Sequence, residues 1–354
     1  VNLFEDVFNN ASLPPDDEEN TEYELRTQLR RLLSFAELAL EFASFAEKPD
    51  RVFWLERFSG YRGEQAVRFV MTPLDIQELM REAVLSPYET VIFTSATLRV
   101  GGNFLYWKTR IGLENFRERT PVECVFPSPF PYEESVLVAV PRDLPRPDEE
   151  GYTRVLTETV LETLAVSEGR GLVLFTSYEL LNRVYERVRE GLRQFGIDVL
   201  KQGDDERSRL LRRFNAETST VLFATDSFWE GVDSPGETLE MLILTRLPFR
   251  VPSEPITKAR MARIEARGGN SFIELSLPDA IMRFRQGFGR LIRHQTDRGV
   301  VLILDSRVVN KTYGRHFLES LPQTRRVVTG LSGVMEEIER FFTHTQKKTA
   351  PGRQ

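Results

Sequence analysis

Short apolar segments alternate with segments of helical periodicity through most of the chain beyond residue 148. An apolar segment with no polar face is typical of a strand that is covered on both sides of its sheet. Strands separated by helices in this way form parallel sheets with helices on both faces. The expected strands are 172–175, 199–202, 221–224, 241–245 and 300–305, and the expected helices are 149–167, 177–195, 204–215, 255–267, 277–293 and 311–320. The pattern predicts an α/β fold, in which ligands bind at the carboxyl ends of the strands.

The first part of the chain has a different pattern. Leucine and phenylalanine recur there at helical spacing, and two strand-like segments then flank a glycine-containing turn. The expected elements are a long helix at 21–47, hairpin strands at 51–56 and 66–71, a short helix at 74–85 and a fully buried strand at 90–94. Prolines punctuate the residues from 99 to 147, around one apolar strand at 136–140, which indicates a linker that enters a new domain.

The composition fits a protein of two domains. The 354 residues are 41% hydrophobic, which allows a core in each domain, and no apolar run reaches the roughly 20 residues of a membrane span. A net charge of −6 argues against a protein that coats itself with positive charge to bind nucleic acid, although arginines cluster locally. Cys124 is the only cysteine, which excludes a disulfide framework or a multi-cysteine metal site within this chain. A cytoplasmic protein with no membrane contact and no metal site of its own is expected.

Hydroxyl side chains follow two of the predicted strands. Thr176 and Ser177 come after 172–175, and Thr225 and Ser227 come after 221–224. Hydroxyls and backbone amides at the start of a helix are suited to contact phosphate groups. The alternative for each residue is a helix cap with no ligand, which is the usual role of serine and threonine after a strand.

The segment 286–293 combines arginines with an apolar face. Gln286, Arg290 and Arg293 have the spacing i, i+4, i+7, which places them on one face of the helix expected at 277–293. The opposite face is apolar and consists of Phe284, Phe288 and Leu291. Arginines held in front of packed aromatic rings present fixed guanidinium groups to an oxyanion, as an arginine finger does in phosphoryl transfer. The alternative is a basic helix packed on the sheet, but two internal glycines, each costing about 1 kcal/mol relative to alanine, disfavour a purely structural role.

Several motifs occur in an order that is known from one family. They are TSATL at 94–98, FTSY at 175–178, ATDSFWEGVDSPG at 224–236, LTRLPF at 244–249 and QGFGRLIR at 286–293. The first resembles motif III, and the others resemble motifs IV, V and VI, of superfamily 2 helicases of the DinG/XPD type. The DinG branch is the more similar one, through SFWEGVDSPGE and the stretch from Leu277 to Asp305. The resemblance covers most of residues 66–325.

The resemblance implies a motor of two RecA-like domains that bind ATP and Mg²⁺ between them. Arg290 and Arg293 would reach the γ-phosphate, and Gln286 would lie near the phosphate or the attacking water. Three further residues are implied at the nucleotide: Asp233 at the ribose hydroxyl, Gly231 where the backbone approaches closely, and Glu230 in coupling to movement.

The same resemblance implies contacts with single-stranded DNA. These would be made to the DNA backbone, which carries no sequence information. The residues implied are Thr176, Ser177, Thr225 and Ser227. Ser95 and Thr97 would link the state of the ATP site to closure of the two domains.

Two motifs of such helicases are missing. The phosphate-binding sequence G-x-x-x-x-G-K-[ST] does not occur in the chain, and neither does a DEAH-type box on a strand. The resemblance therefore implies that the N-terminal motor domain of the same parent protein completes the ATP site. It also implies that an iron-sulfur cluster, where one exists, lies outside this chain. The implied divisions are 1–65 as the end of an arch-like insertion, 66–98 as a remnant of the first motor domain, 99–131 as a linker, 132–345 as the second RecA-like domain and 346–354 as a polar tail.

The leading hypothesis is the C-terminal half of an ATP-dependent 5′→3′ DNA helicase that is inactive as an ATPase by itself. A non-catalytic nucleic-acid-binding module and the strand-feeding half of a helicase-nuclease fusion are the alternatives. Glu230, Asp233, Arg290 and Arg293 occur together, which disfavours a module that has lost its motor. The sequence of the parent protein before Val1 would decide among the three.

Overall fold

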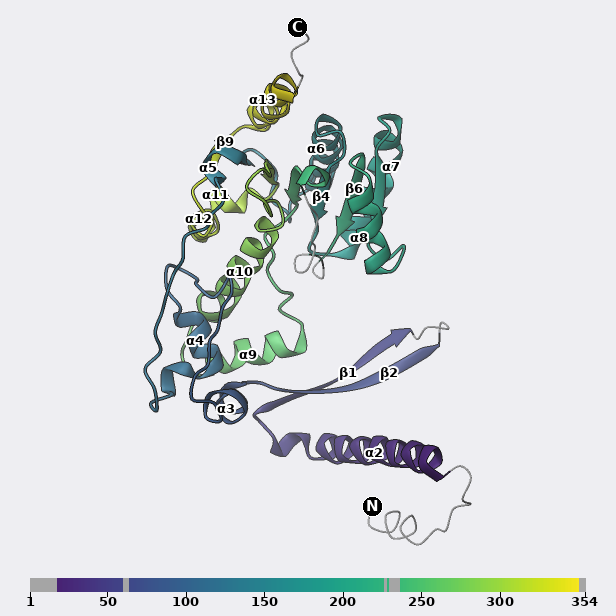
Figure 1. Ribbon diagram of the computed structural model, residues 1–354, viewed down its shortest axis with the longest axis vertical. Coiled ribbons are helices and arrows are strands. Elements are labelled where there is room, and N and C mark those ends of the chain that lie inside the picture. Colours follow the sequence, from purple (N-terminus) through teal and green to yellow (C-terminus); the bar gives the residue numbers. More distant parts are fainter. Residues whose placement is uncertain (1–17, 60–63, 226–227, 229–235, 350–354) are drawn as a thin grey trace.

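A parallel sheet organises the larger part of the molecule (Figure 1). The computed structural model describes residues 18–59, 64–225, 228 and 236–349. Seven strands follow the order β5-β6-β4-β7-β8-β3-β9, and every neighbouring pair is parallel. They are β3 (Val136–Pro141), β4 (Gly171–Leu174), β5 (Asp198–Lys201), β6 (Thr220–Ala224), β7 (Met241–Leu244), β8 (Gly299–Ile303) and β9 (Arg325–Thr329). The predicted α/β class with a RecA-like sheet is confirmed.

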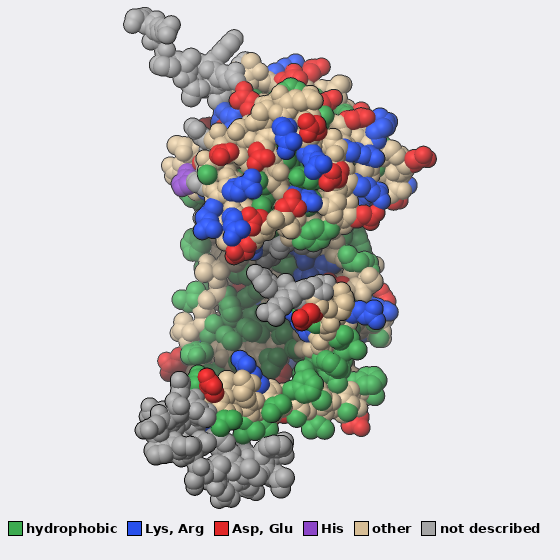
Figure 2. All heavy atoms as spheres, turned by 90° about the vertical axis from the view of Figure 1, so that its right-hand side faces the viewer, with side chains coloured by type: hydrophobic (Ala, Val, Ile, Leu, Met, Phe, Trp, Pro, Cys, Tyr) green, Lys and Arg blue, Asp and Glu red, His purple; other side chains and the backbone are tan. Residues whose placement is uncertain are grey.

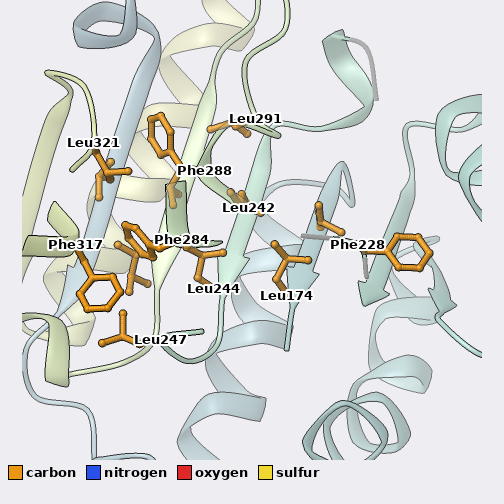
Figure 3. Close-up of a cluster of buried hydrophobic side chains, with 14 of the residues drawn as sticks. Leu174, Phe228, Leu242, Leu244, Leu247, Phe284, Phe288, Leu291, Phe317 and Leu321 are labelled. Atoms are coloured by element: carbon orange, nitrogen blue, oxygen red, sulfur yellow. The ribbon is translucent and has the colours of Figure 1, made fainter. Parts of the chain in front are cut away.

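Helices cover both faces of this sheet. One face packs on α6 (Tyr152–Val166), α7 (Tyr178–Gln194) and α13 (Leu331–Thr349), and the other on α8 (Arg207–Ala216), α10 (Leu277–Phe288) and α12 (Arg315–Glu319). Successive residues of a strand point to opposite faces, so Leu172 and Leu174 join one core cluster and Val173 joins the other. Figure 3 shows the first cluster, where Phe284 and Phe288 of α10 pack over Leu242 and Leu244 of β7.

A helix and a hairpin lie at the end of the molecule opposite α13 (Figure 1). The helix is α2 (Glu18–Ala43), and β1 (Arg51–Ser59) pairs antiparallel with β2 (Gln65–Pro73). Phe42 of α2 packs edge-on against Phe53 and Phe69, with ring centroids 5.1 and 5.2 Å away. Hydrophobic side chains such as Leu55, which is 59% exposed, also face solvent here, and Figure 2 shows them gathered below the charged surface of the sheet domain.

Short elements lie before the sheet and between its strands. Those before the sheet are η1 (Phe45–Glu47), α3 (Gln77–Met80), η2 (Arg81–Leu85), α4 (Leu105–Ile111), η3 (Leu113–Asn115) and α5 (Tyr132–Ser135). Those within the sheet domain are η5 (Gly236–Thr238), α9 (Pro255–Ala266), η6 (Phe272–Ser276), α11 (Arg307–Asn310) and η7 (Thr312–Gly314). The interval 99–131, predicted as a linker, thus contains α4. Arg260 of α9 donates from Nε to the carbonyl of Leu74, 3.1 Å away, which ties α9 to the end of the hairpin.

The prediction of a buried strand at 90–94 is wrong. These residues are irregular, and Ile92 is 82% exposed. The local pattern is strand-like, but among the described residues no strand pairs with it, and a single strand cannot satisfy its own backbone groups. Two elements near the end of the chain, β9 and α13, were not predicted, and α13 extends through Thr349 into the stretch expected to be a polar tail. None of the helices in the described part of the chain has the length and apolar character needed to cross a bilayer.

Candidate functional site

The two predicted arginines lie in a turn that follows α10 and leads into β8. The helix ends at Phe288, where Gly289 is the C-cap, so Gln286 is helical while Arg290 and Arg293 are not. The prediction that all three share one helical face is therefore wrong. The chain leaves the helix to bury the adjacent Leu291 and Ile292, which are 2% and 3% exposed. The predicted apolar cluster of Phe284, Phe288 and Leu291 is nevertheless present.

Asp297 holds this turn in shape. Its Oδ2 accepts hydrogen bonds from the backbone N–H groups of Arg293 and His294, at 2.8 and 2.7 Å. The residue is only 6% exposed, so a buried carboxylate fixes the backbone that carries Arg293. Gly236 also lies beside Asp297, because a Cβ added to Gly236 would stand 3.8 Å from Oδ1. The segment that begins after Thr225 thus returns to the sheet next to the arginine-bearing turn.

Four predicted site residues fall within that segment. Ser227, Glu230, Gly231 and Asp233 lie outside the described residues. Their neighbour Phe228 is described and is 1% exposed, so it anchors the segment in the core. The expected nucleotide contacts therefore lie between two described residues, Phe228 and Gly236.

Arg285 joins α10 to the TSATL segment, a contact that no pattern in the sequence indicates. Its guanidinium donates to the carbonyl of Ala96, 2.7 Å away, and to that of Arg99. Burial lowers the pKa of Arg285, and the positive charge of Arg99 lowers it further. Ser95 and Thr97 lie in the same turn, with their hydroxyl oxygens 3.2 Å apart. The predicted coupling residues therefore stand against α10, beside the residue that precedes Gln286.

The start of α10 is fixed by a second buried carboxylate, Asp279. It accepts a hydrogen bond from the hydroxyl of Tyr106 in α4 and lies 3.4 Å from both Arg110 and Arg250. Asp279 is 7% exposed. Burial, followed by the negative charge of Asp279, raises the pKa of Tyr106 well above its ordinary value, so the hydroxyl stays a donor. Asp279 and Arg285 thus anchor both halves of α10 to chain segments that precede the sheet.

The hydroxyl residues stand at the other end of the sheet, at the carboxyl ends of the strands. Thr225 is 5% exposed and donates from its backbone N–H to Oε1 of Gln202, 2.6 Å away. Gln202 in turn donates from Nε2 to the hydroxyl of Tyr178, at 2.5 Å. Ser177 accepts a hydrogen bond from the backbone N–H of Leu180, at 3.3 Å, and so caps α7, which is the alternative role expected for a serine after a strand. Thr176 is half-buried and lines a cavity at this edge.

The predicted residues therefore form two groups rather than one. Thr176, Ser177 and Thr225 gather at the carboxyl ends of β4 and β6, whereas Arg290 and Arg293 precede the amino end of β8. In the described part of the chain no group of three or more His, Cys, Asp or Glu side chains could hold a metal ion. The arginine turn offers guanidinium groups for an oxyanion, and the carboxyl edge offers hydroxyl and amide donors for phosphates.

Comparison with known proteins shows similarity to helicases. Residues 160–324 match the family described as helicase C-terminal domain. The chain is 40% identical over 256 residues to an ATP-dependent DNA helicase, YoaA, of Haemophilus influenzae, which covers 72% of this chain and 39% of that protein. It is 35% identical over 285 residues to a protein of Bacillus subtilis named 3′-5′ exonuclease DinG, covering 79% of this chain and 30% of the relative.

Solved structures show the same fold. An XPD helicase superimposes with a TM-score of 0.56 at 17% sequence identity, over 82% of this chain and 50% of that one. At this identity the likeness concerns the fold alone. The chain spans 39% and 30% of the length of the two sequence relatives, so more than half of each relative has no counterpart here.

Proposed function

Because this chain belongs to the DinG/XPD type of superfamily 2 helicases and carries their C-terminal helicase domain, we propose that it is one half of an ATP-driven DNA helicase motor. In this proposal the turn after α10 presents Arg290 and Arg293 to the γ-phosphate of ATP. Gln286, at the end of the helix, lies close to the attacking water. A first motor domain of the same parent protein holds the remainder of the nucleotide.

The observation that carries the proposal is the anchoring of the arginine-bearing turn. An arginine finger must be positioned before the reaction, because it lowers the barrier through a charge already aligned with the transition state. Asp297 fixes the turn at Arg293 and His294, and Arg285 fixes the preceding helix. A helix that only packed on the sheet would need neither anchor.

The residues present fit a phosphate group but not a complete ATP site. Guanidinium groups bind phosphate oxygens through paired hydrogen bonds. In P-loop ATPases the Mg²⁺ ligands are a hydroxyl of the phosphate-binding loop and an acidic side chain on a strand. The sequence has no such loop, so the proposal assigns Mg²⁺ and the β-phosphate to the other motor domain. Glu230, Gly231 and Asp233 complete the nucleotide contacts from this side.

Single-stranded DNA is the proposed second ligand, at the carboxyl edge of the sheet. Thr176, Ser177, Thr225 and Ser227 contact its backbone in this proposal, and translocation runs 5′→3′. Ser95 and Thr97 link the state of the ATP site to closure of the two domains in this proposal, because Arg285 holds their segment against α10. In this proposal residues 1–65 belong to an arch-like insertion, 66–98 to the first motor domain and 132–345 to the second.

Unwinding assays on duplexes with 5′ or 3′ single-stranded tails test the polarity. Faster unwinding of the 3′-tailed duplex would exclude 5′→3′ translocation.

Replacing Arg290 in the parent protein tests the proposal. Arg290→Ala should lower the DNA-stimulated ATPase rate on the order of 10³-fold, because an arginine finger contributes that much to transition-state stabilisation. Binding of a fluorescent ATP analogue should change little. Arg193→Ala is the matched control, since Arg193 is 74% exposed and lies at the far end of α7. An ATPase rate within a few-fold of wild type in Arg290→Ala would refute the role.

The isolated chain provides a second test. It should bind single-stranded DNA yet show no ATPase activity with or without DNA, because the phosphate-binding loop is absent from its sequence. Turnover by the purified chain that persists after chromatography would contradict the proposal. Mixing the chain with a separately produced first motor domain should restore activity if the two halves assemble.

A strand-feeding role beside a nuclease is the second candidate. The observation in its favour is the name of the Bacillus subtilis relative, 3′-5′ exonuclease DinG, of which this chain matches 30%. In that case the parent would carry a nuclease domain before the helicase portion, and Arg290→Ala would leave nuclease activity intact while ATP hydrolysis is lost. The sequence of the parent decides between the two.

A further inference from the structure

A cavity of about 470 Å³ opens at the carboxyl edge of the sheet, where three neighbouring strands end. Thr176 follows β4, Arg246 follows β7 and Arg307 follows β8, and these strands are adjacent in the order β4-β7-β8. Ligands of open parallel sheets bind just beyond the carboxyl ends of the strands. The arginine-bearing turn after α10 lies outside this cavity, whereas Arg246, Leu247 and Phe249 of the LTRLPF motif line it.

The charges that line the cavity do not cancel. Arg146, Arg246, Arg307 and Lys311 are cationic, and Asp148 is the one acidic residue of the lining. Arg146 lies 3.7 Å from Asp148 and 2.8 Å from Glu149. Arg307 forms an ion pair with the fully buried Asp305 and donates hydrogen bonds to it from Nε and Nη2, at 2.9 and 2.6 Å. Two positive charges, those of Arg246 and Lys311, are left uncompensated by any described carboxylate.

Arg246 is held in place without an anionic partner. Its Nη2 donates a hydrogen bond to the carbonyl of Pro147, 3.1 Å away, and its guanidinium lies 5.1 Å from the centroid of the Tyr152 ring. Its Nε is buried and has no hydrogen-bond partner among the described residues. A buried N–H of a charged group without an acceptor is costly, so the site lacks one acceptor. Lys311 is exposed at the rim and forms no ion pair within the part of the chain that the structure describes.

We propose that this cavity is a binding site for a backbone phosphate of single-stranded nucleic acid, held by Arg246, Lys311 and the hydroxyl of Thr176. One phosphodiester carries one negative charge and several acceptor oxygens, which matches two cations, an orphaned N–H and a hydroxyl. This inference rests on the proposed helicase function and adds to it a phosphate-binding role for Arg246 and Lys311, to which no role was assigned from the sequence.

The position of the cavity favours a nucleic-acid chain over a free anion. Thr225 follows β6 and Thr176 follows β4, and the cavity continues the same edge across β7 and β8. Four neighbouring strands about 4.8 Å apart make an edge of about 14 Å. That length exceeds one phosphate group and suits several linked ones. Arg307 also lines the cavity. Its charge is neutralised by Asp305, and its guanidinium lies 5.7 Å from the centroid of the Phe249 ring, so it is a fixed part of the cavity wall.

Salt-dependent binding of a fluorescent oligothymidylate to the intact chain tests the site. Each single-strand phosphate contact contributes about 0.7 to the slope of log K against log salt. Lys311→Ala and Arg246→Ala should each lower that slope by about 0.7, and affinity at 0.1 M salt should fall about fivefold per contact. Arg246→Lys should keep the slope while losing part of the affinity. Arg193→Ala, on the far end of α7, should change neither quantity.

Each possible result either supports or overturns the assignment of the cavity as a DNA-phosphate site. An unchanged slope and affinity in both alanine variants would overturn the cavity as a DNA site while leaving the helicase proposal standing. Absence of binding by the wild-type chain would refute both. Inorganic phosphate and thymidine monophosphate, added as competitors, identify the alternative source. If Arg246 is needed to bind these small anions but not the oligonucleotide, the cavity is a free-phosphate site and the inference is wrong. Because Lys311 is exposed, Lys311→Ala tests the site even if Arg246→Ala fails to fold.

Discussion

Asp297 is the residue whose loss should affect both the stability of the domain and its chemistry. Its Oδ2 accepts two backbone hydrogen bonds, at 2.8 and 2.7 Å, and the residue is 6% exposed. Hydrogen bonds to a charged group contribute about 1.5–3 kcal/mol each, and the N–H groups left behind lose their acceptor. Because the neighbouring His294 side chain is 64% exposed, water can reach one of the two groups. Asp297→Ala should therefore lower the free energy of unfolding by about 3 kcal/mol.

Urea denaturation of the chain measures this change. Asp297→Asn retains an oxygen acceptor but loses the charge, so it should lower the free energy of unfolding by only about 1 kcal/mol. Asp198→Ala is the control, because Asp198 pairs with Arg213 at the surface, where the two side chains are 52% and 55% exposed. A surface pair contributes about 0–1 kcal/mol. Equal losses in Asp297→Ala and Asp198→Ala would refute the structural role given to Asp297.

The same substitution should affect catalysis in the parent protein. A displacement of about 1 Å in a group that acts at the transition state can reduce the rate about 100-fold. Asp297→Ala should thus lower kcat of the DNA-stimulated ATPase about 100-fold, with a smaller change in KM for ATP. A destabilised protein with wild-type kcat at a temperature where it remains folded would show that Asp297 does not position Arg293 for the reaction.

Two further substitutions probe other contacts. In the parent, Arg285→Ala should lower kcat of the DNA-stimulated ATPase more than the ATPase rate without DNA, because Arg285 joins α10 to the Ser95–Thr97 turn; equal losses with and without DNA would contradict this. Arg285→Lys keeps the charge but can reach one carbonyl at a time, and should recover only part of the rate. Burial, and then the negative charge of Asp305, raises the pKa of Tyr152 well above its ordinary 10.0. A raised pKa stabilises the fold below pH 10 and this contribution is lost as pH rises, so urea denaturation should show wild type losing more stability above pH 10 than Tyr152→Phe; parallel losses would refute it.

The sheet was predictable because its strands are apolar on both faces. Val173 and Leu174, for example, point to opposite sides, and each side is covered by helices. The strand β9 was missed for the converse reason, since it lies at the edge of the sheet and includes the exposed Arg325 and Arg326. An edge strand can be half polar and then lacks the signature of the others. The helix α13 did carry a signal, because Val334, Ile338 and Phe342 recur every four residues and are buried.

The candidate site was predictable in its residue types but not in its contacts. The motif positions indicate Arg290, Arg293 and Thr225 as candidates, and the glycines at 287 and 289 disfavour a purely structural helix. The end of α10 at Phe288 could not be placed, because helical spacing continues in the sequence beyond it. The hydrogen bond from Arg285 to Ala96 joins residues 189 positions apart, and that from the N–H of Thr225 to Gln202 joins residues that follow two neighbouring strands. Such contacts depend on the fold, and local patterns cannot reveal them.

The two groups of site residues lie at opposite ends of the strands, and one segment connects them. Thr225 leaves β6 at its carboxyl end, whereas Gly236 stands beside Asp297 near the amino end of β8. β6 has five residues, which corresponds to about 17 Å, and the chain between Thr225 and Gly236 can cover about 36 Å when extended. The extended length is about twice the length of β6, so the chain from Thr225 to Gly236 is long enough to connect the two ends of the strands. Glu230, Gly231 and Asp233, which are proposed to hold the nucleotide, belong to that same segment, so in the sequence they lie between the group at the carboxyl edge and the arginine-bearing turn.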